Sequence, residues 1–356
     1  MALAPVVLAL NSSGFAIAQK VATALGIKVH GRQGRVADAD AYFANALDHT
    51  RDLFASGTPI IGVCASGILI RAVAPLLTDK TTEPPVISVS DDGRVVVPLL
   101  GGHRGANRLA YNIAEALGGI AAVTTAGDVS LGVSLDEPPQ GWALVNRSDA
   151  KGAMAELLAG GGASLSGDEA VNADWLKGLP AGEAVRLTCA IAPQSDLGPT
   201  HLQFAPKRVA VGVGCARNCS TEEMAGLVRS TLRDAGVCDA AVHSVNTISL
   251  KADEPAILDL AASLAAPLRL FSASELEIET PRLATPSDVV FAEVGCHGVC
   301  EAAALAQLGS EGILWVQKRK TSKATVALGL FPKPMAEFLG EARGRLSVVG
   351  IGPGQA

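Results

Sequence analysis

Short apolar runs alternate with stretches of helical periodicity over the first 130 residues of the chain. Apolar residues between positions 106 and 117 recur at intervals of three and four, the spacing of one helix face. The pattern predicts strands at 6–10, 60–63, 86–89, 94–100 and 120–124, and helices ending near 25 and spanning 39–54, 67–77 and 106–117. Such alternation is typical of a mainly parallel sheet with helices on its faces.

The same pattern resumes at Lys207, after a less regular segment that Pro and Gly residues punctuate at 131–206. It predicts strands at 208–215, 289–294 and 313–316 and helices after 220 and at 299–308. Ser220 and Glu223 have the spacing of a capping box. We therefore predict an α/β fold in which two α/β lobes with mainly parallel sheets, 1–130 and 207–332, are joined by a small irregular middle module at 131–206.

Composition and charge narrow the class of protein. The 356 residues exceed what one hydrophobic core usually holds, and 49% of them are hydrophobic, so a globular chain of several domains is expected. The net charge of −6 argues against a broad basic surface for nucleic acid. No apolar run approaches the roughly 18 residues that span a bilayer. The first ten residues look like a buried strand rather than a targeting segment. The odd number of cysteines, seven, indicates free thiols in a reducing cytoplasm, where we expect a soluble protein.

A glycine-rich turn at 101–107 contains the best-placed histidine of the chain, His103, between a predicted strand and a predicted helix. This arrangement directs backbone N–H groups toward a ligand at a helix N-terminus. Histidine is the usual general base for activating water, and Arg104 adds positive charge beside it. A local hydrogen bond within the turn is the alternative interpretation. Asp128 follows another predicted strand, where α/β proteins gather ligands, and could orient the base.

Several cations are candidates for binding an anionic ligand. Arg71 could bind a carboxylate bidentately and Lys80 could act as a point charge, although a solvated helix face explains both equally well. A dense basic run, with Lys318 and Lys320, follows the strand at 313–316 and fits either a polycarboxylate or a solvated loop. The Cys296 and Cys300 spacing is atypical of structural zinc, so buried thiols are favoured and a redox-labile cluster is the alternative.

The motifs at 67–80, 99–107 and 124–128 together resemble the cobalt-precorrin-5A hydrolase family of cobalamin biosynthesis, CbiG. Those at 212–215, 220–223, 250–254 and 299–305 look like the second region of that family, which also occurs alone as a CobE-like protein. The resemblance spans roughly 60–330. Gly101 stands where the resemblance leads us to expect a serine.

The resemblance implies a reaction: the δ-lactone of cobalt-precorrin-5A is opened, giving cobalt-precorrin-5B and acetaldehyde. His103 would activate water, and Asp128 would orient the His103 side chain. The backbone N–H groups of 105–107 would stabilise the oxyanion. The residues expected to bind the anionic tetrapyrrole are Arg71, Lys80, Arg104, Asn107, Glu301, Lys318 and Lys320. Cobalt would belong to the substrate, so we expect no cofactor and no metal site on the protein.

The last residues carry a second resemblance. The stretch at 346–354 is similar to the opening strand and loop of a precorrin-3B methyltransferase. We therefore expect 333–356 to be a linker and the first strand of an absent methyltransferase domain, and a hand-off of product to precorrin methyltransferases. The alternative function is a non-catalytic carrier that binds a precorrin and passes it on.

Overall fold

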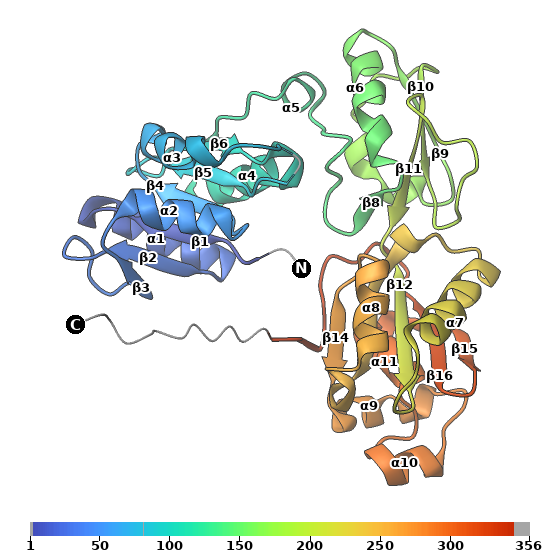
Figure 1. The fold of residues 1–356 in the computed structure, drawn as a ribbon. Coiled ribbons are helices and arrows are strands. Elements are labelled where there is room, and N and C mark those ends of the chain that lie inside the picture. The colour runs from blue at the N-terminus through green and yellow to red at the C-terminus, as the bar shows by residue number, and fades with distance from the viewer. Residues whose placement is uncertain (1–2, 81, 345–356) are drawn as a thin grey trace. The chain divides into compact units, whose positions relative to one another are not determined.

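The computed structural model describes residues 3–80 and 82–344, except for the side chains of His103 and Ala126. The chain divides into two compact units, Met1–Glu137 and Pro138–Ala356 (Figure 1). Both units are α/β, as predicted, and parallel pairing predominates in the first of them. The domain boundaries predicted from the sequence stay a prediction. No helix within the described ranges is both long and apolar enough to cross a membrane.

The N-terminal unit contains one seven-stranded sheet in the order β3-β2-β1-β4-β5-β6-β7. Its strands are β1 (Val6–Ala9), β2 (Lys28–Arg32), β3 (Ala41–Phe43), β4 (Ile60–Val63), β5 (Val86–Val89), β6 (Val95–Leu100) and β7 (Ile120–Ala121). Neighbouring strands are parallel except β5 and β6, which are antiparallel. The last two strands therefore run opposite to the first five.

Helices cover both faces of this sheet. They are α1 (Ser12–Leu25), α2 (Ala46–Ala55), α3 (Ser66–Val73) and α4 (Ala106–Leu117), and a further short helix, α5 (Ala126–Leu131), follows β7. One buried cluster joins α1 and α4 to Val7, Ile61 and Ile87, and a second joins α2 and α3 to Leu8 and Ile60. Successive side chains of a strand point to opposite faces of the sheet, so Val7 faces α1 and α4 whereas Leu8 faces α2 and α3.

The predicted helix at 39–54 is wrong in its first third. Residues 41–43 form β3, and α2 begins only after Asn45, whose side chain accepts hydrogen bonds from Leu47 N and Asp48 N. The Asp40 carboxylate accepts from Val29 N at 2.8 Å and fixes the segment beside β2. A helix cap and a side chain distant in sequence therefore override the apparent periodicity.

The middle of the chain is more regular than predicted, because it contains its own four-stranded sheet in the order β8-β11-β10-β9. The strands are β8 (Trp142–Leu144), β9 (Ala163–Ser166), β10 (Val185–Cys189) and β11 (His201–Pro206), and α6 (Ala150–Leu158) packs on β10 and β11. The strands β9, β10 and β11 are parallel. The Trp175 ring meets Phe204 edge-on at 5.0 Å, so one face of this sheet is apolar.

The remaining sheet has six strands in the order β15-β16-β12-β13-β14-β17. They are β12 (Val209–Cys215), β13 (Val242–Ile248), β14 (Leu268–Phe271), β15 (Ile313–Lys320), β16 (Ala324–Leu330) and β17 (Glu341–Ala342). The helices are α7 (Thr221–Asp234), α8 (Pro255–Ser263), α9 (Ala273–Ile278), α10 (Asp288–Val294) and α11 (Cys300–Leu308). The three strands β12, β13 and β14 are parallel, and the outer ones pair antiparallel.

Several local predictions for this sheet need correction. The apolar run at 289–294 forms α10 rather than a strand; Val289 is 70% exposed, so the run faces solvent instead of a sheet. Only half of the predicted capping box is present: Ser220 Oγ accepts from Glu223 N, but the Glu223 carboxylate binds the turn at 321–323. Strand β15 extends to Lys320, so Lys318 is on a strand. The predicted strand within 346–354 lies outside the described residues.

Candidate functional site

The turn that contains His103 depends on close backbone packing. Strand β6 ends at Leu100, and Gly102–Arg104 form one turn of 3-10 helix before α4. Gly101 has φ +78°, and a Cβ there would lie 2.7 Å from Pro85 Cα. A side chain would therefore be strained in conformation and would overlap the Pro85 backbone. This explains the glycine at the position where a serine was expected.

Backbone hydrogen bonds within the turn use two of the predicted oxyanion donors. Ala106 N donates to Gly101 O at 3.1 Å, and Gly105 N donates to Gly102 O at 3.4 Å. Arg104 N also donates to Gly101 O, at 2.8 Å. The N–H groups of Gly105 and Ala106 thus stabilise the turn itself, in contrast to the predicted role for residues 105–107.

The structure brings Asn107 and Asp128 together beyond the ends of β6 and β7. Asn107 is buried in the first turn of α4, and its Nδ2 donates to Thr125 Oγ1 at 2.6 Å and to Asp128 Oδ2 at 3.0 Å. The amide therefore fixes the half-buried Asp128 carboxylate in one orientation. The backbone of His103 lies in the turn just before α4. A contact between His103 and Asp128 stays a prediction.

Arg104 positions the loop that contains Lys80. Its Nη1 donates to Thr82 O at 2.6 Å, while the buried Glu83 carboxylate accepts from Thr78 N at 2.7 Å. These two side chains hold the loop from both ends, and Lys80 is exposed on it. Arg71 is exposed in the last turn of α3, where its Nη1 donates to Gly67 O of the same helix.

The sheet of the N-terminal unit has a second candidate site, at its opposite edge. Because β6 runs antiparallel to β5, the His103 turn lies at the edge where β5 begins, against Pro85. A pocket of about 380 Å³ opens near the carboxyl ends of β4 and β5, lined by Cys64, Ser66, Ser88 and Asp91 among others. Parallel α/β sheets bind ligands at such ends, where the strand order reverses.

The sheet order places that reversal between β1 and β4, because β2 follows β1 on one side and β4 lies on the other. Ser13 Oγ, just beyond β1, donates to Asp91 Oδ2 at 3.0 Å. Polar residues that line or border this second site follow β1, β4 and β5 in the sequence: Ser13, Ser66 and Asp91. The order of the strands is needed to bring these residues together.

In the C-terminal unit, Glu301 is 2% exposed and accepts three backbone hydrogen bonds. Its Oε2 accepts from Ala284 N and Thr285 N, each at 2.9 Å, and its Oε1 accepts from Lys318 N at 2.8 Å. The carboxylate thereby joins α11 to β15 and to the loop after α9. These bonds account for its burial without a ligand, and its predicted role in substrate binding stays a prediction.

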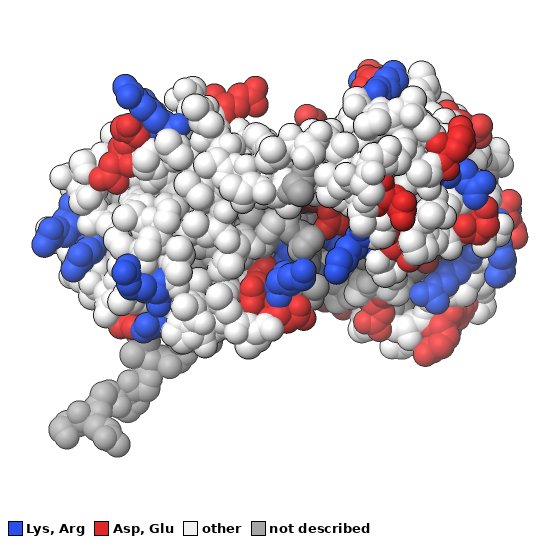
Figure 2. Space-filling model, turned by 90° about the horizontal axis from the view of Figure 1, so that it is seen from above, with Lys and Arg blue, Asp and Glu red and all other residues white. Residues whose placement is uncertain are grey.

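The basic run at the end of β15 is partly engaged in structural contacts. Arg319 Nη1 pairs with Asp234 Oδ2 at 2.6 Å, and Lys323 Nζ donates to Asn218 O at 3.2 Å. Lys318 is half-buried and Lys320 is exposed. In the view of Figure 2, Lys and Arg side chains gather in small groups beside Asp and Glu rather than in one broad basic surface.

The seven cysteines are unpaired thiols. Burial raises the pKa of Cys215 and of Cys300 to about 11, so both are protonated at neutral pH and are poor nucleophiles. Within the described part of the chain no cluster of three or more His, Cys, Asp or Glu could hold a metal ion. His297 contacts Glu277 instead of the thiols, with Nδ1 2.8 Å from Glu277 Oε1.

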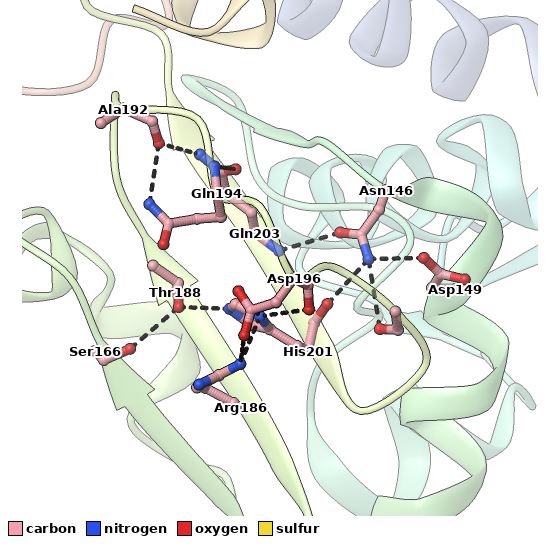
Figure 3. Close-up of polar contacts among 11 residues, drawn as sticks. Asn146, Asp149, Ser166, Arg186, Thr188, Ala192, Gln194, Asp196, His201 and Gln203 are labelled. Carbon is pink, nitrogen blue, oxygen red and sulfur yellow. Dashed lines mark hydrogen bonds and ion pairs between the residues drawn. The ribbon is translucent and has the colours of Figure 1, made fainter. Parts of the chain in front are cut away.

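A further pocket, of about 330 Å³, lies on the polar face of the middle sheet (Figure 3). Ser166 of β9, Arg186 and Thr188 of β10 and His201 of β11 line it. The sequence analysis missed these residues. The signal was the alternation of polar and apolar positions at 185–189 and 201–204, which is too short to predict a strand on its own.

Comparison with known proteins gives two family matches. The model described as "Cobalamin synthesis G N-terminal" matches residues 48–128, and "Cobalamin synthesis G C-terminus" matches residues 209–329. The first segment contains the His103 turn and Asp128, and the second contains Glu301 and Lys318. The pocket of the middle sheet lies between the two matched segments.

Three curated relatives are similar to the chain. A cobalt-precorrin-5A hydrolase of Priestia megaterium is 28% identical over 303 residues, 79% of this chain and 80% of the relative. A cobalt-precorrin-5A hydrolase of Salmonella typhimurium is 29% identical over 346 residues, 90% of this chain and 96% of the relative. Protein CobE of a Sinorhizobium species is 44% identical over 120 residues, 34% of this chain and 78% of the relative.

Proposed function

The chain belongs to the cobalamin synthesis G family, and from that premise we propose that it is a hydrolase of cobalamin biosynthesis that acts on cobalt-precorrin-5A. The observation that carries this proposal is the similarity to two cobalt-precorrin-5A hydrolases over 79% and 90% of the chain. The reaction opens the δ-lactone of the macrocycle and releases acetaldehyde, giving cobalt-precorrin-5B. The metal arrives with the substrate, so the protein contributes no cofactor.

The proposed catalytic groups lie at the edge of the N-terminal sheet that contains the His103 turn. His103 removes a proton from a water molecule, whose oxygen attacks the lactone carbonyl. In this proposal Asp128 stabilises the imidazolium that forms, and Asn107 Nδ2 holds the Asp128 carboxylate in one orientation through a hydrogen bond of 3.0 Å. Collapse of the tetrahedral intermediate breaks the ring C–O bond, and the imidazolium of His103 returns its proton to the oxygen that leaves, which gives a carboxylate and a carbinol. The carbinol O–H then loses its proton, its carbon becomes the carbonyl carbon of acetaldehyde, and the electron pair of the broken C–C bond passes to the macrocycle, which takes up a proton.

Cationic side chains at the same edge are proposed to bind the substrate's carboxylates. Arg104 holds the loop through Thr82 O, which keeps the exposed Lys80 in place beside the turn. Arg71 is a further candidate on α3. In the C-terminal unit, Lys318 and Lys320 offer a separate carboxylate-binding surface on β15. Hand-off of the product to a precorrin methyltransferase is part of the same proposal.

The decisive experiment measures acetaldehyde released from cobalt-precorrin-5A by the purified full chain. We expect turnover by the wild-type protein and a loss of at least 100-fold in His103→Ala, since general-base catalysis contributes about 10²–10⁴-fold. His49→Gln, on α2, is the matched histidine control and should keep full activity. Turnover by His103→Ala at the wild-type rate would remove His103 from the mechanism. A shifted corrinoid absorption band without acetaldehyde would identify a carrier instead of a hydrolase.

A further inference from the structure

The pocket of the middle sheet combines a buried histidine and a buried threonine with an exposed serine. Its lining residues belong to β9 and the turn that follows it, to β10 and β11, and to the loop at 190–200. The strand register places Ser166 opposite Thr188, and Arg186 opposite His201. All four side chains therefore project from the same face of the sheet, because residues two apart on a strand share a face.

Hydrogen bonds connect these side chains in a row (Figure 3). Ser166 Oγ lies 3.2 Å from Thr188 Oγ1, and Thr188 Oγ1 lies 2.8 Å from His201 Nε2. On the other side of the ring, His201 Nδ1 lies 3.1 Å from Asp196 O and 3.2 Å from Asp196 Oδ1. Thr188, His201 and Asp196 have the hydroxyl, imidazole and carboxylate order of a nucleophile, its general base and the group that orients the base, and the Ser166 hydroxyl extends this row by one hydrogen bond.

The contacts of the ring favour one tautomer. Two acceptors, the carbonyl and the carboxylate of Asp196, face Nδ1, so the proton belongs on Nδ1. Arg186 Nη2, which can only donate, also lies 2.9 Å from Nδ1. A proton on Nδ1 serves both Asp196 acceptors, and Arg186 Nη2 then donates to Asp196 Oδ2 alone. With the proton on Nδ1, Nε2 accepts from the Thr188 hydroxyl, which in turn accepts from Ser166.

Burial differs along the row in the way that a base and a nucleophile require. His201 is 5% exposed and Thr188 is 7% exposed, whereas Ser166 is exposed at the end of β9. Gly167 follows Ser166 with φ +95°, and a Cβ there would collide with the Cys189 carbonyl oxygen. This close approach holds the Ser166 hydroxyl against β10, within reach of Thr188.

We propose that this pocket is a second catalytic site, a serine-dependent esterase that acts on small polar carboxylic esters. Ser166 Oγ attacks the ester carbonyl carbon, its proton passes to Thr188 Oγ1, and the Thr188 proton passes to His201 Nε2. The C–O bond to the alcohol breaks, and the alcohol receives the proton back through the same row. Water then attacks the acyl-Ser166 ester and gives its proton to His201 Nε2 through Thr188. The bond from the acyl carbon to Ser166 Oγ breaks, the row returns the proton to Ser166 Oγ, and the acid is released.

The other groups of the pocket suit such a substrate. Arg186 lines it and is the cation nearest to the row, so it can stabilise negative charge on the carbonyl oxygen. The volume of about 330 Å³ is at the small end of the range for ligand pockets. None of these groups takes part in the proposed lactone hydrolysis, and all of them lie between 166 and 201, outside both matched family segments.

The test uses the full chain and a fluorophosphonate probe, which forms a bond from phosphorus to an activated serine oxygen and releases fluoride. We expect mass spectrometry to find the adduct on Ser166. Ser166→Ala should abolish the adduct, and Thr188→Val, which keeps the shape but breaks the row, should slow its formation by about 100-fold or more. Ser164→Ala, the other serine of β9, is the matched control and should react like the wild type.

Hydrolysis of p-nitrophenyl acetate gives an independent readout of the same variants. We expect Ser166→Ala and Thr188→Val each to lose at least tenfold of the rate, with melting temperatures close to wild type for the exposed Ser166 position. Labelling at another residue, no labelling, or equal rates in Thr188→Val and the wild type would overturn the proposal. Those outcomes would leave the row with a single role, that of fixing the loop at 190–200 over the sheet.

Discussion

Replacing Glu301 with glutamine distinguishes a structural carboxylate from one that binds substrate. The side chain is 2% exposed, and its oxygens accept from the backbone of Ala284, Thr285 and Lys318. Glutamine keeps the shape, but its NH₂ group is a donor, so at least one backbone N–H meets another donor. An unsatisfied buried donor costs about 1–3 kcal/mol, and more where the lost partner was charged, so we expect a loss of about 2–3 kcal/mol.

Thermal unfolding followed by circular dichroism measures this loss. In a unit of about 200 residues each kcal/mol lowers Tm by about 2–4 °C, so Glu301→Gln should lower Tm by about 4–12 °C. Glu311→Gln, at an exposed position, is the matched control and should leave Tm unchanged. Hydrogen exchange should also accelerate at the Lys318 amide.

The opposite result would refute this reasoning. If Glu301→Gln melted like the wild type, exchanged like it at Lys318, and raised KM for cobalt-precorrin-5A, the carboxylate would be a substrate ligand. The three backbone bonds would then contribute little to stability.

Three further perturbations test other parts of the structure. Gly101→Ser should destabilise the N-terminal unit by about 1–3 kcal/mol, because a side chain at positive φ overlaps Pro85; an unchanged unfolding midpoint would contradict that packing. Asn107→Ala should lower kcat for acetaldehyde release by about 10-fold with little change in KM, since Asp128 loses its orienting bond; a change in KM alone would assign Asn107 to binding. Burial lowers the pKa of His243 to about 4 from an unfolded value of 6.5, so on acidification the unfolded chain binds the proton first. The free energy of unfolding therefore decreases as the pH is lowered from 6.5 to 4. His243→Phe should flatten this part of the Tm-against-pH curve.

The sequence predicted those helices and strands whose ends are determined by residues next to them in the chain. Strand β1 and α1 follow from apolar spacing and from Asn11, whose side chain caps the helix, and α11 follows from the glycine turn at 295–298 that precedes it. The run at 289–294 was misinterpreted, because a short apolar segment fits a strand and an exposed helix equally well. Strand β3 was missed, because Asp40 and Asn45 determine it through bonds to the backbone.

The candidate sites also divide into those formed by residues adjacent in the sequence, which were predicted, and those formed by residues far apart in the sequence, which were not. The turn at His103 is encoded by adjacent glycines, so the sequence located it. The contact between Asn107 and Asp128 joins residues 21 positions apart, and the row from Ser166 to His201 joins three separate strands. Such contacts depend on strand order and register, which one sequence without relatives does not determine.

Because β6 runs antiparallel to β5, the N-terminal unit has two separate sets of loops whose sequences can be changed independently. A fully parallel sheet collects the loops that follow its strands at one edge only. Here the loops after β1, β4 and β5 meet at one edge and those after β6 and β7 at the other. Loop sequences at the two edges can therefore be exchanged separately, and a graft of new residues around Ser66 and Asp91 should leave the His103 turn intact.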